Sequence, residues 1–295
     1  NTPKTMDNLK EVSSKKVCGG FIKEFAHASK SVGGSMVFGV FVPPWALENN
    51  KVPAIMYLSD HGCNPRKSIE EGLAFRSAAL EGVMLIFPDT SPRHCEVEGD
   101  AESKDVAIGK GAGFYLNATE PKWKANYQMD TYVNEELPAL ITKHFPFNGM
   151  LSIMGHSMGG HGALVSYLRN PGKYKSVSAF SPMCNPSNCS MGTRVLKGYL
   201  GSDKSNWSRY DATTLMTTME FKGEKPEILI DQGLEDELYK SKQLLPEAFV
   251  QACKGAKYPL KINFHEGYDH SYFFVSTFMP NHIGFHARAL KAKSK

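Results

Sequence analysis

Residues 150–164 read MLSIMGHSMGGHGAL, and this stretch decides how the chain folds. Its first five residues are apolar and β-prone, and residues 160–168 can form a helix. Between them Ser157 stands in a G-x-S-x-G pattern, whose glycines permit a strained strand-to-helix turn. Such a turn lifts the serine hydroxyl off the sheet and places the Met158 N–H beside it, where it can stabilise an oxyanion. The pattern alone is common, but with this flanking strand and helix it predicts a nucleophilic serine.

Composition excludes several classes of protein. The chain has 295 residues, 41% of them hydrophobic, and carries 34 basic against 30 acidic side chains. The small, scattered positive charge does not indicate a nucleic-acid partner. No apolar run is long enough to span a bilayer, and neither end resembles a signal peptide. The six dispersed cysteines form no C-x-x-C pair, so we expect reduced thiols in a cytoplasmic protein with no membrane partner.

Apolar strands alternate with helical segments along most of the chain. Strands are expected at 54–58, 83–87, 150–154, 177–181, 227–231 and 260–264, with helices over 68–81 and 131–144. Two earlier strands, 20–25 and 36–42, form a meander with a turn at 33–34. This pattern predicts one α/β domain over residues 1–295, with a mostly parallel sheet covered by helices on both faces. Residues 1–16 and 291–295 are expected to be peripheral, and the segment 90–127 to loop over the carboxyl ends of the strands, where the chemistry lies.

A serine hydroxyl needs a base within hydrogen-bond reach and an acid that orients the base. In a fold of this kind these residues follow the serine in the order acid, then histidine, each after a strand. Asp231 ends the strand 227–231 and Asp236 lies in the loop beyond it, so both are candidate acids, with Asp236 favoured. His270 lies in the loop between the last strand and the C-terminal helix, which makes it the favoured base.

The other histidines near these elements fit the role of base less well. His265 is still at a strand end, and His156 and His161 flank the serine too closely. His282 and His286 lie on the C-terminal helix and are interpreted as surface residues.

A second oxyanion donor is expected in the loop after strand 54–58, at the backbone N–H of His61. The same region holds Cys63, and His94 and Cys95 follow further along. Their spacing is not that of a zinc site, so no metal is expected.

Longer stretches from about residue 17 to 290 are typical of one family. They are 18–20 (CGG), 87–93 (FPDTSPR), 111–119 (GAGFYLNAT), 155–164 (GHSMGGHGAL), 170–180 (NPGKYKSVSAF), 198–201 (GYLG), 231–233 (DQG) and 266–272 (EGYDHSY). On these residues the chain resembles the S-formylglutathione hydrolases, also called esterase D, which have the α/β-hydrolase fold.

The resemblance implies Ser157 as nucleophile, Asp236 rather than Asp231 as acid, and His270 as base. It also implies a cytosolic enzyme without a cofactor, often a homodimer. Members of the family hydrolyse S-formylglutathione to glutathione and formate, and also cleave small activated esters. The expected partner is therefore a small acyl thioester or ester.

The chain departs from the family at several positions. Asp60 and His61 stand where the family usually has Gly-Leu, His94 replaces a glycine, Asp130 a tyrosine and Met191 a tryptophan. These changes predict an altered, softer acyl pocket, and a negative Asp60 aimed at the oxyanion would slow catalysis. The candidate pocket residues are Asp60, Cys63, His94, Met191 and His156.

Three functions are consistent with these observations. The first is a serine hydrolase that works through an acyl-enzyme. The second is an acyltransferase that passes the same acyl group to another acceptor. The third is a binding protein that kept the triad and lost efficient turnover.

Overall fold

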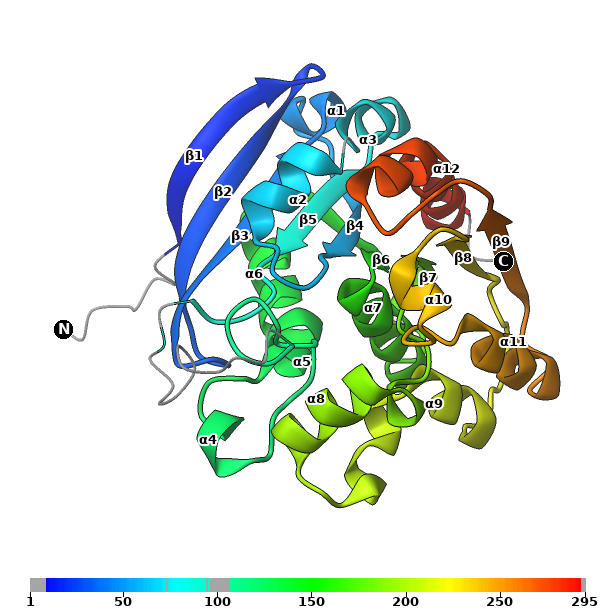
Figure 1. The fold of residues 1–295 in the computed structure, drawn as a ribbon. Coiled ribbons are helices and arrows are strands. Elements are labelled where there is room, and N and C mark those ends of the chain that lie inside the picture. Colours follow the sequence, from blue (N-terminus) through cyan, green and yellow to red (C-terminus); the bar gives the residue numbers. More distant parts are fainter. Residues whose placement is uncertain (1–8, 73, 94, 96–106, 293–295) are drawn as a thin grey trace.

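The computed structural model describes residues 9–72, 74–93, 95 and 107–292 of the chain (Figure 1). Its centre is a nine-stranded sheet of order β1-β2-β3-β5-β4-β6-β7-β8-β9. The strands are β1 (Lys10–Val17), β2 (Gly20–Ser29), β3 (Gly34–Val42), β4 (Val52–Leu58), β5 (Met84–Pro88), β6 (Phe147–His156), β7 (Tyr174–Phe180), β8 (Ile228–Gly233) and β9 (Leu260–His265).

The strands β5, β4, β6, β7, β8 and β9 run parallel, and β1, β2 and β3 pair antiparallel along one side. The predicted α/β-hydrolase architecture is therefore confirmed, and the meander expected at 20–42 is β2 and β3. No strand was expected at β1. This strand is an exposed edge strand rich in lysine and serine, so it lacks the apolar pattern by which strands are recognised.

Most of the helices lie in the connections between parallel strands, whereas α1 lies between β3 and β4 and α12 follows β9. They are α1 (Pro44–Leu47), α2 (Pro65–Glu71), α3 (Phe75–Glu81), α4 (Pro121–Lys124), α5 (Met129–Thr131), α6 (Leu137–His144), α7 (Met158–Arg169), α8 (Ser190–Leu200), α9 (Ala212–Thr218), α10 (Glu237–Lys240), α11 (Pro246–Gly255) and α12 (Tyr272–Lys291). The helix expected over 68–81 is divided into α2 and α3. The one expected over 131–144 is α5, a π-helical turn (Tyr132–Glu136) and α6, and the turn comes just before Pro138, which lacks an N–H.

The sheet buries a separate core on each face. Along β4, Ala54, Met56 and Leu58 belong to the core under α7, whereas Ile55 and Tyr57 belong to the core under α3 and α12. Side chains alternate between the faces of a strand, so a fully buried strand has to be apolar throughout. Figure 1 shows α12 beside α3 on one side of the sheet and α7, with α8 and α9, on the other. Within the described residues no helix is both long and apolar enough to cross a bilayer.

Candidate active site

Ser157 occupies the sharp turn between β6 and α7. Its backbone has φ 55° and ψ −114°, so the strain of the turn lies on the serine itself. The glycines on either side make the turn possible, as predicted, because a β-carbon at either position would clash with neighbouring backbone. A Cβ on Gly155 would lie 2.2 Å from the Gly159 carbonyl oxygen, and a Cβ on Gly159 would lie 1.9 Å from that of Leu58. The strand β4, the strand β6 and the first turn of α7 can meet only because both side chains are absent.

Three side chains from three separate loops meet beside this turn. The Ser157 Oγ lies 2.8 Å from the His270 Nε2, although the two residues are 113 positions apart in the chain. The His270 Nδ1 lies 2.6 Å from the Asp236 Oδ2. Ser157 and Asp236 are buried, and 21% of the His270 side chain is exposed. We call these residues the Ser157 triad; their arrangement is that of a nucleophile, its base and the acid that orients the base.

Asp236 is held in place from several directions. It precedes α10, and its Oδ1 accepts hydrogen bonds from the backbone N–H groups of Leu238 and Tyr239. Its Oδ2 accepts one from the Gln232 side-chain amide, at 3.2 Å. Burial raises the pKa of Asp236, but the hydrogen bond and charge of His270, together with these donors, outweigh burial and lower the pKa. The carboxyl is therefore ionised and rigid. Sequence reasoning missed Gln232, a buried amide at the end of β8 whose only signal is its place four residues before the acid.

Opposing effects act on the pKa of His270. Burial lowers it, and this is the largest single effect. The hydrogen bond to Asp236 and the negative charges of Asp60, Asp236 and Asp269 raise it, and together they prevail. The imidazole is consequently a stronger base than a free histidine.

The ring of His156 packs against the ring of His270. It is almost wholly buried, with its ring centroid 4.7 Å from that of His270 and 5.6 Å from that of Tyr272. Burial, and then the charge of His270, lower the pKa of His156 to about 4, so the ring is neutral near pH 7. The structure thus brings this predicted pocket residue into the site as a packing surface for the base.

The two predicted oxyanion donors, the N–H groups of Met158 and His61, differ in their hydrogen bonding. Met158 is the first residue of α7, so its N–H has no intrahelical acceptor. The N–H of His61 donates to the Oδ1 of Asp60 at 2.6 Å. The Asp60 Oδ2 lies 3.7 Å from the His270 Nε2, so the Asp60 carboxylate lies directly at the site.

Comparisons with known proteins point to esterases. A family model described as "Putative esterase" matches residues 29–285. The chain is 49% identical to the S-formylglutathione hydrolase of Mus musculus and 47% identical to that of Arabidopsis thaliana, over 96% of this chain and 99% and 98% of theirs. It matches the structure of an S-formylglutathione hydrolase from Agrobacterium tumefaciens with a TM-score of 0.90 at 43% identity, over 95% of this chain and 99% of the other.

The chain belongs to the S-formylglutathione hydrolase family. The resemblance inferred from the sequence is therefore confirmed, and the protein is an esterase of the serine hydrolase type. The interpretation as a binding protein without turnover loses its support.

The remaining pocket candidates are Cys63, Met191 and His94. Cys63 is buried, and its Sγ lies 3.6 Å from the Tyr272 hydroxyl oxygen. Met191 lies on α8; its N–H donates to the Gln243 side chain, and its own side chain packs on the core under α7. His94 lies outside the described residues. That these residues line an altered pocket stays a prediction.

One departure from the family pattern has a structural explanation. Asp130 is buried, and its Oδ2 pairs with the Arg169 guanidinium at 2.6 Å and accepts from the Tyr210 hydroxyl at 3.0 Å. The pair lies where α5 meets the end of α7, with the Asn134 amide donating to the other carboxylate oxygen. This aspartate braces two helices.

The rival acid, Asp231, belongs to a different cluster, which we call the Ser178 network. Its Oδ2 lies 3.2 Å from the His282 Nε2, and the His282 Nδ1 lies 2.8 Å from the Ser178 Oγ. The same hydroxyl contacts the His286 Nε2 at 2.7 Å, and the His286 Nδ1 contacts the Ser176 Oγ at 2.7 Å. The interpretation of His282 and His286 as surface residues is wrong, because both are fully buried between α12 and the sheet.

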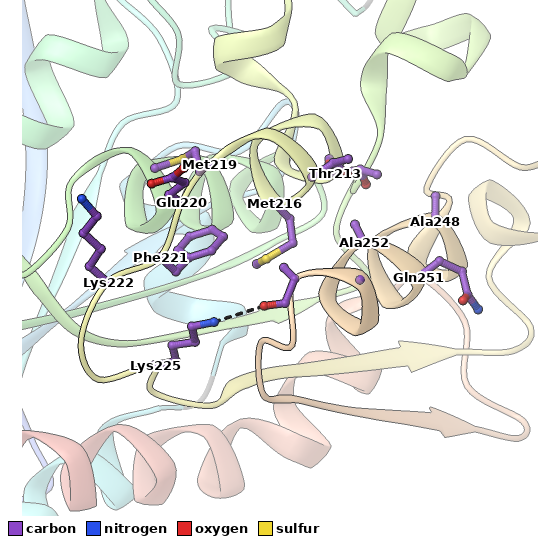
Figure 2. Close-up of a pocket in the computed structure, with 13 residues that line it drawn as sticks. Thr213, Met216, Met219, Glu220, Phe221, Lys222, Lys225, Ala248, Gln251 and Ala252 are labelled. Carbon is purple, nitrogen blue, oxygen red and sulfur yellow. Dashed lines mark hydrogen bonds between the residues drawn. The ribbon is translucent and has the colours of Figure 1, made fainter.

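Two further features are a hollow away from the Ser157 triad and a group of possible metal ligands within the site. A hollow of about 860 Å³ lies between α9 and α11, and Figure 2 shows Met216, Phe221 and Lys225 around it. None of the residues that line it belongs to the Ser157 triad. Among the described residues, Asp60, His156 and His270 also place their ligand atoms within 4.8 Å of one another, as a metal ion would need. His270 and Asp60 already take part in the contacts given above, so we assign no metal to them.

Proposed function

We propose that this protein hydrolyses S-formylglutathione and related small thioesters or esters through an acyl-enzyme on Ser157. The observation that carries the proposal is the Ser157 triad, placed at the carboxyl ends of the parallel strands in a chain of this family. The hydrolysis of S-formylglutathione is inferred from the names of the relatives, which match nearly the whole chain.

Acylation begins with neutral His270. Its Nε2 removes the proton of the Ser157 Oγ as this oxygen attacks the acyl carbon, and the 2.8 Å contact already has the geometry for this transfer. Asp236 holds the imidazole in the tautomer with a proton on Nδ1 and stabilises the positive charge that forms. The N–H of Met158, with that of His61 once it is released from Asp60, binds the oxyanion.

Deacylation repeats these steps with water. The thiol or alcohol leaves with the proton held on Nε2, and water then occupies the place beside the base. His270 removes a proton from the water, which attacks the acyl carbon, and the Ser157 oxygen recovers its proton as the acid is released. An acyltransferase differs only at this step, where another nucleophile replaces water.

A fluorophosphonate probe and S-formylglutathione together test the proposal. We expect the probe to label Ser157, and glutathione and formate to appear in equal amounts. Absence of labelling, or undiminished hydrolysis by Ser157→Ala, would exclude the acyl-enzyme. Formation of an acylated product with added thiols or amines, at the expense of formate, would indicate acyl transfer.

The acyl preference of the pocket is a second part of the proposal. Met191 replaces a large ring with a flexible chain, which is expected to admit acyl groups longer than formyl. Comparing kcat/KM for S-formylglutathione and for longer acyl esters, in wild type and Met191→Trp, tests this. If the variant keeps the wild-type ratio, Met191 does not determine the preference.

The remaining proposals concern the whole molecule. We propose that the chain folds as a single domain that works in the cytoplasm as a homodimer. In support, one continuous sheet runs through the described residues, and all six cysteines are free thiols, as suits a reducing compartment. Analytical ultracentrifugation at micromolar concentration tests the dimer, and a single sharp sedimenting species of monomer mass would refute it.

A further inference from the structure

The loop after β4 contains three consecutive backbone N–H groups, those of His61, Gly62 and Cys63, and they differ in their acceptors. The Gly62 N–H donates to the carbonyl of Gly111 at 2.8 Å, and the Cys63 N–H donates to the carbonyl of Asp60 at 3.1 Å. Both acceptors are main-chain groups fixed by the fold. The N–H of His61 donates to the side chain of Asp60 at 2.6 Å. A side chain can rotate away, so this amide is the one of the three that a substrate oxygen can take over.

The other oxygen of this carboxylate faces the base. The Asp60 Oδ2 lies 3.7 Å from the His270 Nε2, which is 2.8 Å from the Ser157 Oγ. The carboxylate therefore lies between an oxyanion donor and the base. When Ser157 attacks an acyl group, the carbonyl oxygen has to lie near the His61 N–H and the leaving group near His270.

We propose that the Asp60 carboxylate occupies the oxyanion site of the resting enzyme and has to be displaced from the His61 N–H before acyl transfer. The inference rests on the proposed function, because it concerns the same serine and the same donor. A carboxylate oxygen carries the negative charge that the oxyanion of the tetrahedral intermediate carries. The resting protein thus gives to its own side chain a hydrogen bond that would otherwise be made only in the transition state, and such a bond slows turnover.

A purely electrostatic role for Asp60 makes a different prediction. The groups that face His270 are Asp236 at Nδ1, Asp60 at Nε2, the His156 ring against its face and Asp269 next to it in the chain. If Asp60 acted only through its charge on the base, removing it would shift the pH profile and leave the plateau of kcat/KM at high pH unchanged. Occupation of the oxyanion site instead lowers the plateau itself, so the plateau distinguishes the two roles.

The experiment compares Asp60→Ala and Asp60→Asn with wild type and with Asp269→Asn. Asp269 is the matched control, because it lies beside His270 but accepts its hydrogen bonds from Ser271. Two quantities are measured: the plateau of kcat/KM for p-nitrophenyl acetate, and the Kd of a phenylboronic acid, which forms a tetrahedral adduct with an active serine. Thermal melting shows whether each variant is folded.

Removal of one oxyanion donor costs about 10²–10³-fold in other serine hydrolases, so release of a donor that is occupied is expected to gain about tenfold. We therefore expect Asp60→Ala to raise the plateau and tighten boronate binding by about tenfold each. Asp60→Asn should gain less, because its amide oxygen still accepts from His61 but carries no charge. Asp269→Asn should stay within about twofold of wild type on both measures.

The outcomes separate this inference from the proposed function. A plateau in Asp60→Ala equal to or below that of wild type, in a folded protein whose Ser157 still reacts with the fluorophosphonate, overturns the role of Asp60 and leaves the hydrolase intact. If Asp269→Asn gains as much as Asp60→Ala, the gain comes from the loss of a negative charge, and the proposed role of Asp60 is overturned as well. If Ser157 is labelled in no variant, the proposed function itself fails.

Discussion

The described residues contain two sets of serine, histidine and aspartate, and we propose that only one of them reacts. The Ser157 triad lies at the carboxyl edge of the sheet, on three loops. The Ser178 network lies between α12 and the sheet, where its side chains are buried. Both join the three groups by hydrogen bonds of 2.6–3.2 Å. Residue types and distances therefore do not identify a catalytic triad, and position in the fold has to be considered.

Three differences separate the two sets. Ser157 lies on a strained turn and is followed by the Met158 N–H, which has no acceptor within α7, whereas Ser178 lies within β7. The imidazole is also reversed, since His270 offers Nε2 to its serine and His282 offers Nδ1. The third difference is the pKa of the imidazole. In His270 the neighbouring carboxylates raise the pKa against the effect of burial, whereas in His282 burial lowers it. One set thus makes a base at an accessible edge, and the other satisfies polar groups inside the core.

The largest contrast is expected between two serine variants. Ser157→Ala should lower kcat for S-formylglutathione by about 10⁴-fold or more, since the nucleophile is lost. Ser178→Ala should leave kcat within about twofold but lower the free energy of unfolding by about 1–3 kcal/mol, because two buried imidazoles lose a partner. Steady-state kinetics and urea denaturation measure both. A Ser178→Ala protein that is folded and inactive would contradict the division of roles.

The two aspartates give the next contrast. Asp236→Asn should reduce kcat by about 10³–10⁴-fold with little change in KM, because the amide favours the wrong tautomer of His270. Asp231→Asn should act on stability, since Asp231 accepts from His282 and Asn263 in the interior. The same kinetic and denaturation measurements apply. Comparable losses of kcat in the two variants would mean that the acid has been misassigned.

A smaller effect is expected on the stability of the protein as the pH falls. Burial, and then the charge of His282, hold the pKa of His286 well below its ordinary value of about 6.5. The unfolded chain then binds more protons than the folded one below about pH 6.5, so stability falls as pH falls through this range. His286→Gln, which keeps a neutral polar group, should make the melting temperature between pH 7.5 and 5.5 less dependent on pH. An unchanged slope would show that other groups take up the protons.

The smallest effect concerns the pH dependence of activity. His270 must be neutral to act, and its pKa is raised, so kcat/KM should rise with pH through a value above that of a free histidine. Asp269→Asn removes an exposed charge next to His270 in the chain and should move this limb slightly to lower pH. Rates across pH 5–9 measure the shift. A movement to higher pH would contradict the assigned electrostatics.

Sequence reasoning found the residues whose place follows from the order of elements. Ser157, Asp236 and His270 each follow a recognisable apolar strand, and the loops after parallel strands meet at one edge. Their hydrogen bonds could therefore be anticipated without coordinates. The oxyanion loop was located in the same way, but the contact between Asp60 and the His61 N–H depends on one side-chain rotamer, which no pattern encodes.

The misses have identifiable causes. His282 and His286 share the helical spacing of Met279, Ile283 and Leu290, all buried on α12. This periodicity indicates a buried face, whereas the polarity of the histidine side chain on its own predicts exposure. Partners for buried histidines come from serines on β7, which lie more than a hundred positions away. Local pattern cannot show such partners.

The backbone of Ser157 has one more consequence. A φ of 55° is unfavourable for any residue with a side chain, and the residue that bears it is the proposed nucleophile. Ser157→Gly would relieve that conflict, so an inert protein is expected to outlast the working enzyme on heating. Laboratory selection for heat resistance alone would therefore favour glycine at this position, at the cost of the hydroxyl.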